Sequence, residues 1–247
     1  MFRFNPGIEN KIFPPKAPYY KTKTKKEKDV IDRILDQKQT SRAIQANNKI
    51  LSEKYNLPLG KPMSYIEANE GKENPKFKKK GGYWENCQTC TMTHLLRRRG
   101  FNIQAKPNNI LYYRHQGTIY DELDRVGVEW HERFLNLDGS LPKYKTFDSW
   151  RHKNNKRINR KSLDEYLKET MKQDGIYEVY VKRKNSNITH LFCAETLGGG
   201  IHFFDPQSGK RDVYSIFNDS DISYTKILRI DNKIVNPKVG RLFLPTK

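Results

Sequence analysis

Cysteine chemistry is the first activity that the sequence suggests, because Cys87 and Cys90 stand three residues apart in "WENCQTCTMTHLLRRRG". This stretch is predicted to form a helix from about Asn86 to Arg99 that stops at Gly100. Asn86 is a favoured N-cap residue type, which places Cys87 at the first helical position. The unpaired backbone N–H groups and the positive dipole end there favour a thiolate. We therefore predict that Cys87 is a nucleophile.

Cys90 is predicted to lie one turn further into the same helix. Its backbone N–H would bond within the helix, and its side chain would share a face with Cys87, Thr91 and His94. We assign Cys90 to packing or support. The division of roles between the two cysteines stays open, with Cys87 favoured by its position in the helix.

A cysteine nucleophile for acyl transfer also needs a base, a group that orients the base, and donors for the developing oxyanion. His190 in "ITHLFC" is predicted to share a strand face with Phe192, and Asp205 ends a later strand in "HFFDPQSG". A helix start that faces these strands would assemble a Cys87, His190 and Asp205 triad. Gln207 is close enough in sequence to be a second orienting group or a substrate contact.

The elements that must position these residues follow the order helix first, sheet last, which predicts an α+β fold. A second helix is expected from Ser162, with Ser162 and Glu165 as a capping box and Gly175 as its stop. The loops "NSN" and "LGGG" are short enough to join the first three strands as antiparallel neighbours. The expected strands cover residues 176–184, 188–195, 201–205 and 222–230.

Composition divides the chain before this core. Prolines and repelling charges predict an extended basic arm, and spaced apolar residues then predict one or two amphipathic helices. A stretch rich in Pro, Gly and Lys is predicted to be a linker that ends near Gly82. The predicted parts are the arm over 1–26, the helical segment over 27–56, the linker over 57–82 and the catalytic domain over 83–247.

The chain carries 47 Lys and Arg against 28 Asp and Glu, a net charge of +19. Such a surface attracts nucleic acid, anionic lipid or acidic protein, and the excess is densest before residue 83. Three cysteines are too few for a disulfide framework and fit a reducing compartment. No secretory signal and no run of about 18 apolar residues is evident, so neither Sec export nor a membrane partner is expected.

Three motifs in order, "NCQTCTMTHLLRRRGFNIQAKPN", "THLFCAE" and "FFDPQSG", resemble the papain-fold toxin family over roughly residues 83 to 230. That family includes putative glutamine deamidases and protease-like domains of bacterial toxin systems. Similar domains also occur with phage minor head proteins. The family's site residues correspond to Cys87, His190, Asp205 and Gln207, and the resemblance implies a papain-like fold.

The resemblance implies a cysteine-dependent hydrolase that acts on a protein carboxamide or peptide bond, as a glutamine deamidase or a protease. It further implies a protein substrate, an immunity protein as partner, and a place in a phage virion or in host cytoplasm after delivery. No cofactor and no metal are expected. The alternative is a structural protein of a phage head, whose basic arm binds capsid, portal or packaged DNA with little or no catalysis; such an arm can also simply be solvated.

The same residues allow other roles. Cys87 and Cys90 with His94 could form half of a zinc site, closed by Cys193 or His190, although no second Cys-x-x-Cys exists. The two cysteines could also form a disulfide. His202 competes with His190 as the base but fits the motif less well, and we expect it to be packing or surface. The remaining histidines, His94, His115, His131 and His152, are expected to be ordinary polar residues.

Overall fold

The computed structural model describes residues 25–69, 71–79, 82–108, 111–113, 118–120 and 122–246. The chain divides into two compact units, one that ends at Ala43 and one that runs from Ile44 to Lys247. The extended arm predicted over 1–26 lies, up to residue 24, outside the described residues. In the part of the chain that is described, no helix is long and apolar enough to span a membrane.

The segment predicted to be helical over 27–56 is a single helix, α3 (Lys25–Tyr55). Its C-terminal part belongs to the second unit, where the Leu51 side chain is fully buried in the core. The Asn47 amide donates to the Val235 carbonyl at 2.8 Å and accepts from the Val235 N–H at 3.0 Å. These two hydrogen bonds tie the end of α3 to the C-terminal segment of the same unit.

The prediction of a linker over 57–82, with a domain boundary near Gly82, is wrong. This segment contains α4 (Tyr65–Ala68), which starts with a capping box, and it buries Glu73 and Asn74 almost completely. The compact unit that contains Cys87 therefore begins at Ile44 rather than at residue 83. The composition predicted a linker because this segment is held in place by buried polar groups and not by a stripe of apolar residues.

A six-stranded antiparallel sheet forms the centre of the second unit, in the order β5-β10-β6-β7-β8-β9. The prediction that three consecutive strands pair as antiparallel neighbours is confirmed by β6, β7 and β8. The fourth predicted strand, β10, pairs with the other edge of β6. The strands are β5 (Lys145–Thr146), β6 (Gly175–Arg183), β7 (Thr189–Leu197), β8 (Gly200–Asp205), β9 (Lys210–Arg211) and β10 (Ser220–Arg229).

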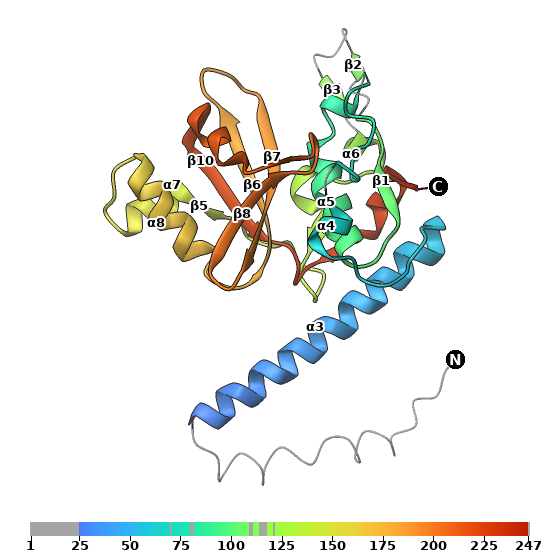
Figure 1. The fold of residues 1–247 in the computed structure, drawn as a ribbon, viewed down its shortest axis with the longest axis horizontal. Coiled ribbons are helices and arrows are strands. Elements are labelled where there is room, and N and C mark those ends of the chain that lie inside the picture. The colour runs from blue at the N-terminus through green and yellow to red at the C-terminus, as the bar shows by residue number, and fades with distance from the viewer. Residues whose placement is uncertain are drawn as a thin grey trace. The chain divides into compact units, whose positions relative to one another are not determined.

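Helices lie on both sides of this sheet (Figure 1). On one side α5 packs on β7, and its Thr91 hydroxyl reaches Glu178 of β6. On the other side α7 and α8 share a hydrophobic core with Val179 and Phe192, which alternate with the residues that face α5. The molecule is therefore α+β, with the predicted helix packed on the sheet. These helices are α5 (Cys87–Arg98), α7 (Phe147–Lys153) and α8 (Arg160–Thr170).

The predicted second helix corresponds to α8, but its predicted ends are wrong. The N-cap is Asn159, whose side chain accepts a hydrogen bond from the Ser162 N–H, so Ser162 and Glu165 do not form the capping box. The helix ends at Thr170, and Gly175 instead begins β6.

Short elements complete the unit around α5. A second hydrophobic core joins Leu95 of α5 to Ile103 and Phe243, which belong to two paired strands, β1 and β12. The short elements are η1 (Gly82–Trp84), β1 (Ile103–Ala105), β2 (Leu111–Tyr113), β3 (Thr118–Tyr120), α6 (Glu122–Arg125), η2 (Trp130–Glu132), β4 (Phe134–Leu135), η3 (Val213–Asn218), β11 (Ile234–Val235), η4 (Pro237–Leu242) and β12 (Phe243–Pro245).

A buried ion pair fixes the first turns of α5 against β6. Arg133 and Glu178 are both fully buried, and the Arg133 guanidinium donates to both Glu178 oxygens at 2.9 and 2.8 Å. Thr91 donates to the same carboxylate at 2.8 Å, and Tyr144 donates at 2.6 Å. Arg133 also donates to the Gln88 carbonyl at 3.2 Å. The start of α5 is thus held to the central strand by polar bonds in a dry interior.

Removing one partner of this pair is expected to destabilise the fold strongly. Arg133→Met leaves Glu178 buried without its counter-ion, which costs about 3 to 5 kcal/mol of unfolding free energy. Urea denaturation measures this loss. The matched control is Lys49→Met, which breaks the exposed Lys49–Glu53 pair on α3 and should cost less than about 0.5 kcal/mol. Equal losses in the two variants would contradict the structural role of Arg133.

Candidate functional site

The predicted helix start is at the expected place, but Asn86 does not cap it as expected. Asn86 occupies the N-cap position of α5, and its side chain makes no capping hydrogen bond to the first turn. The side chain is buried and bonds elsewhere. The first-turn N–H groups beside Cys87 are therefore not taken by the Asn86 side chain.

Asn86 instead joins four parts of the chain that surround Cys87. Its side-chain oxygen accepts from Asn74 at 3.2 Å, from the Cys90 thiol at 3.3 Å and from the Gln207 amide at 3.5 Å. Its side-chain nitrogen donates to the Lys106 carbonyl at 2.9 Å. Asn74 also donates to the Gln207 carbonyl at 2.9 Å. This buried amide network holds the Asp205–Gln207 turn against the start of α5.

His190 and Asp205 come together from two neighbouring strands. His190 is the second residue of β7, Asp205 is the last residue of β8, and His190 Nε2 lies 3.6 Å from Asp205 Oδ1. The turn after β8 fixes the carboxylate, because Asp205 Oδ1 accepts from the Gln207 N–H at 3.0 Å and Oδ2 accepts from the Ser208 hydroxyl at 2.6 Å. Asp205 is thus aimed at His190 by its own turn.

Charge and hydrogen bonding around His190 favour its protonated form. Burial lowers the pKa of His190, but hydrogen bonds with Asp205 and Cys87 outweigh this and raise the pKa from 6.5 to about 10. For Asp205, burial raises the pKa, while the hydrogen bond and charge of His190 lower it overall. At neutral pH the site therefore holds an imidazolium between a carboxylate and the Cys87 sulfur.

A cavity of about 1150 Å³ gives this group access to a substrate. Cys87, His190 and Gln207 line it, and Asp205 lies behind His190. Cys90 is fully buried, and burial raises the pKa of its thiol. The structure thus brings together all four residues that the sequence singled out, and it separates the roles of the two cysteines. Cys87 reaches the cavity, whereas Cys90 supports Asn86.

The structure also places the cysteines and histidines for which other roles were considered. All three cysteines are free. In the described ranges, no group of three or more His, Cys, Asp or Glu side chains could hold a metal ion. His202 is exposed on β8, as expected for a surface residue, and His152 is exposed on α7. His115 lies outside the described residues.

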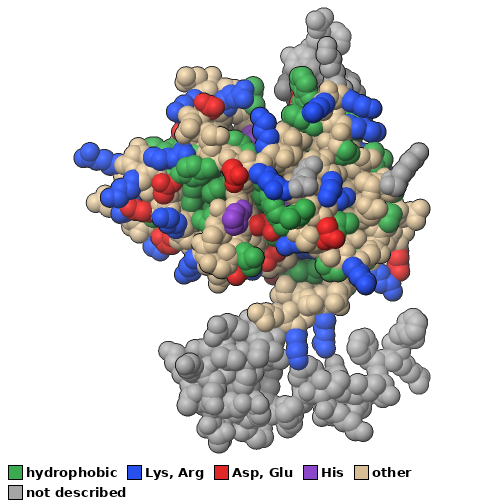
Figure 2. All heavy atoms as spheres, viewed as in Figure 1, with side chains coloured by type: hydrophobic (Ala, Val, Ile, Leu, Met, Phe, Trp, Pro, Cys, Tyr) green, Lys and Arg blue, Asp and Glu red, His purple; other side chains and the backbone are tan. Residues whose placement is uncertain are grey.

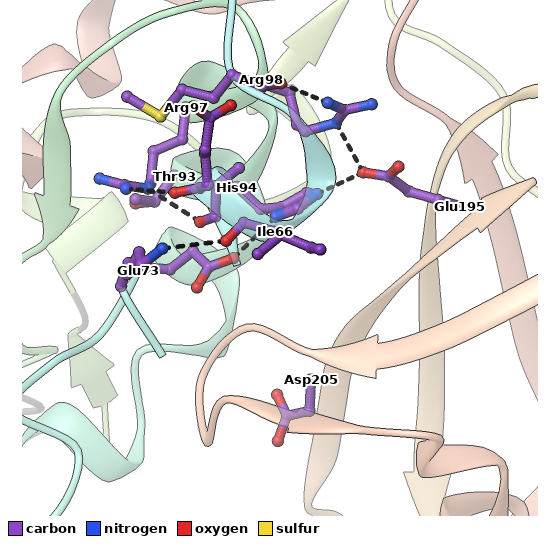
Figure 3. Close-up of polar contacts among 12 residues, drawn as sticks. Ile66, Glu73, Thr93, His94, Arg97, Arg98, Glu195 and Asp205 are labelled. Atoms are coloured by element: carbon purple, nitrogen blue, oxygen red, sulfur yellow. Dashed lines mark hydrogen bonds and ion pairs between the residues drawn. The ribbon is translucent and has the colours of Figure 1, made fainter. Parts of the chain in front are cut away.

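The expectation that His94 is an ordinary polar residue is wrong. His94 is fully buried in α5, with Nδ1 at 2.8 Å from Glu73 and Nε2 at 2.7 Å from Glu195 (Figure 3). Arg98 bonds the same Glu195 oxygen at 3.0 Å. Burial lowers the pKa of His94, but the bonds to the two carboxylates raise it overall. Figure 3 places this cluster apart from Asp205, so we assign it to joining α5, β7 and the segment before α5.

Sequence reasoning missed the residues that support the site. Asn74 lies in a stretch without periodicity, and nothing in the sequence marks it as buried. Glu178 did leave a signal, because a lone carboxylate inside the apolar strand "IYEVYV" must find a buried partner. The identity of that partner, Arg133, depends on the fold.

Comparison of the chain with protein-family models, with curated proteins and with solved structures found no match. The function of the site is therefore inferred from its own geometry.

Thiol accessibility provides a direct check of the cysteine assignment. Iodoacetamide should alkylate Cys87 in the folded protein and spare Cys90 and Cys193, because both of these are fully buried. Peptide mass spectrometry reads the modified positions, and all three cysteines should react in urea. Faster labelling of Cys90 than of Cys87 in native protein would overturn the assignment.

The protonation of His190 can be measured by NMR titration of its imidazole. We expect the ring to stay protonated until the pH approaches about 10, since its pKa is raised to about 10. Asp205→Asn removes the adjacent negative charge and should lower this pKa. His202→Gln, which changes an exposed histidine on the same sheet, should leave it unchanged. A wild-type pKa at or below 6.5 would contradict the described geometry.

Proposed function

We propose that the protein is a cysteine-dependent hydrolase of papain-like type that acts on a carboxamide or peptide bond of a protein. The observation that carries this proposal is the hydrogen bond of His190 with Cys87, which stands at a helix start, and the pairing of His190 with Asp205 on the adjacent strand. A nucleophile, a base and an orienting carboxylate are the groups that acyl transfer requires. Cys87 and His190 line one cavity, so a substrate there would meet both side chains.

In the first step Cys87 attacks the substrate carbonyl carbon as a thiolate, its proton already on His190, and a C–S bond forms while the carbonyl oxygen becomes an oxyanion. The His190 imidazolium then gives its proton to the leaving nitrogen as the C–N bond breaks, which releases ammonia or a new amine terminus. The raised pKa of His190 suits this acid role, because the proton is present before the attack. The Asp205 carboxylate keeps the ring oriented and stabilises its charge.

In the second step water hydrolyses the thioester. Neutral His190 takes a proton from the water, the C–S bond breaks, and the product leaves as a carboxylic acid. Gln207 and the first-turn N–H groups of α5 are suited to stabilise the oxyanion of both steps. The Gln207 amide lies at the cavity wall beside the helix start, where the Asn86 side chain makes no capping hydrogen bond.

Deamidation and proteolysis share this chemistry and differ in the bond that enters the site. A glutamine side chain yields glutamate and ammonia, whereas a backbone amide yields two peptides. A cavity of about 1150 Å³ exceeds the usual range for small-molecule sites, about 300 to 1000 Å³. Its size favours a segment of protein chain over free glutamine as the substrate.

The alternative, a structural protein of a phage head, depends on the basic arm. Residues 1–24 lie outside the described residues, so this alternative stays a prediction. A toxin or effector role and an immunity partner also stay predictions.

The proposed function is tested by incubating purified protein with a host-cell lysate. Mass spectrometry then searches for Gln-to-Glu conversion and for new peptide termini. Wild-type protein should produce one of the two products, and Cys87→Ala should lower the rate by about a thousandfold or more. His190→Ala should cause a comparable loss.

The matched control is His202→Ala, which removes a histidine from the neighbouring strand and should retain wild-type activity. Products that form equally well with Cys87→Ala would show that the chemistry does not use this site. An activity lost equally in His190→Ala and His202→Ala would point to a general effect on the sheet.

A further inference from the structure

The charge of the proposed catalytic cavity is opposite to that of the protein. The chain carries +19, and Lys and Arg side chains are scattered over the face that Figure 2 shows. The charged residues that line the cavity are nevertheless mostly acidic. Among the residues that the structure describes, Glu85, Asp124, Glu129 and Asp219 line it, against the two cations Arg183 and protonated His190. The four carboxylates and Arg183 are exposed, so their charges reach the surface.

Aromatic surface adjoins two of these carboxylates. Trp84, which is 56% exposed, precedes Glu85, and Trp130 follows Glu129; all four residues line the cavity. A tryptophan face beside a carboxylate matches a Lys or Arg side chain, whose alkyl stem packs on the ring while its cation meets the negative charge. The cavity wall therefore has a tryptophan next to a carboxylate at two places, Trp84–Glu85 and Glu129–Trp130.

Within the chain itself, one lysine already uses this aromatic surface. Trp130 stacks on Tyr180 with ring centroids 5.6 Å apart. The Lys226 ammonium lies 5.4 Å from the Trp130 centroid and 5.0 Å from the Tyr180 centroid. Both rings line the cavity, so its wall includes an aromatic pair that attracts an ammonium group, and the Lys226 charge lies beside that pair.

The geometry points to a substrate segment whose reactive carboxamide or peptide bond is flanked by Lys or Arg side chains. This inference rests on the proposed function for the position of the reactive carbonyl, at Cys87. The Trp84–Glu85 and Glu129–Trp130 pairs bind the flanking cations. A protein with a net charge of +19 would attract acidic segments rather than segments with Lys or Arg beside the reactive bond. Selectivity for them must therefore arise at the cavity.

The test uses the full-length protein and synthetic peptides that contain one central glutamine between Lys, Ser or Glu residues. Occupancy of the cavity is measured as protection of Cys87 from iodoacetamide, and labelled peptides are also titrated against Cys87→Ala by fluorescence anisotropy. Neither readout requires turnover. The Lys-flanked peptide should protect Cys87 at roughly tenfold lower concentration than the Glu-flanked peptide, from two contacts of about two- to fivefold each.

Variants of Glu85 and Glu129 test whether these two carboxylates cause the preference for Lys-flanked peptides. Glu85→Gln with Glu129→Gln should remove most of the preference for Lys and keep the shape of both side chains. The control Glu53→Gln removes an exposed carboxylate of α3 and should leave the preference unchanged. Retained preference in the double variant would overturn the inference, as would equal or stronger binding of the Glu-flanked peptide, or no binding of any peptide.

Turnover separates this inference from the proposed function. Selective binding of Lys-flanked peptides without release of ammonia or cleavage would leave the cationic ligand class standing and reject the hydrolase. Turnover without preference for basic flanks would reject the inference and keep the hydrolase.

Discussion

The buried Arg133–Glu178 pair is the interaction on which the arrangement of the site depends. Two buried opposite charges are tolerated when their oxygens and N–H groups find partners, and here Thr91, Tyr144 and the carbonyls of Gln88 and Trp130 supply them. Because two of those partners lie in the first turns of α5, satisfying Glu178 also fixes where that helix begins. Burial of the Glu178 carboxylate on β6 thus fixes the position of Cys87, the candidate nucleophile, which directly precedes Gln88.

A second polar constraint acts from the other side of the helix start. The Asn86 side chain gives up the usual capping role and bonds to Asn74 and to the turn that carries Gln207. The Asn86 side chain therefore makes no capping hydrogen bond to the first turn of α5. The same turn that carries Gln207 aims Asp205 at His190, and hydrogen bonds with Asp205 and Cys87 raise the pKa of the imidazole to about 10.

The residues of the candidate site could be predicted from the sequence, and the residues that support them could not. Cys87, His190 and Asp205 stand in short motifs at a helix start and at strand ends, and alternation together with short loops predicts the hairpins of β6, β7 and β8. His94 and the stretch before residue 82 were misjudged because buried, paired polar groups look like solvated ones in a sequence. Periodicity records apolar faces, whereas these residues are fixed by partners that lie far away along the chain.

The proposed mechanism requires that Cys87 form an acyl-enzyme whose hydrolysis needs His190. Intact-protein mass spectrometry after an acid quench, with an activated ester of acyl-glutamine as acyl donor, detects this intermediate. We expect one acyl group on Cys87, transient in the wild-type protein, persistent in His190→Ala and absent in Cys87→Ala. No adduct in any of these proteins, or an adduct mapped to Cys90 or Cys193, would contradict it.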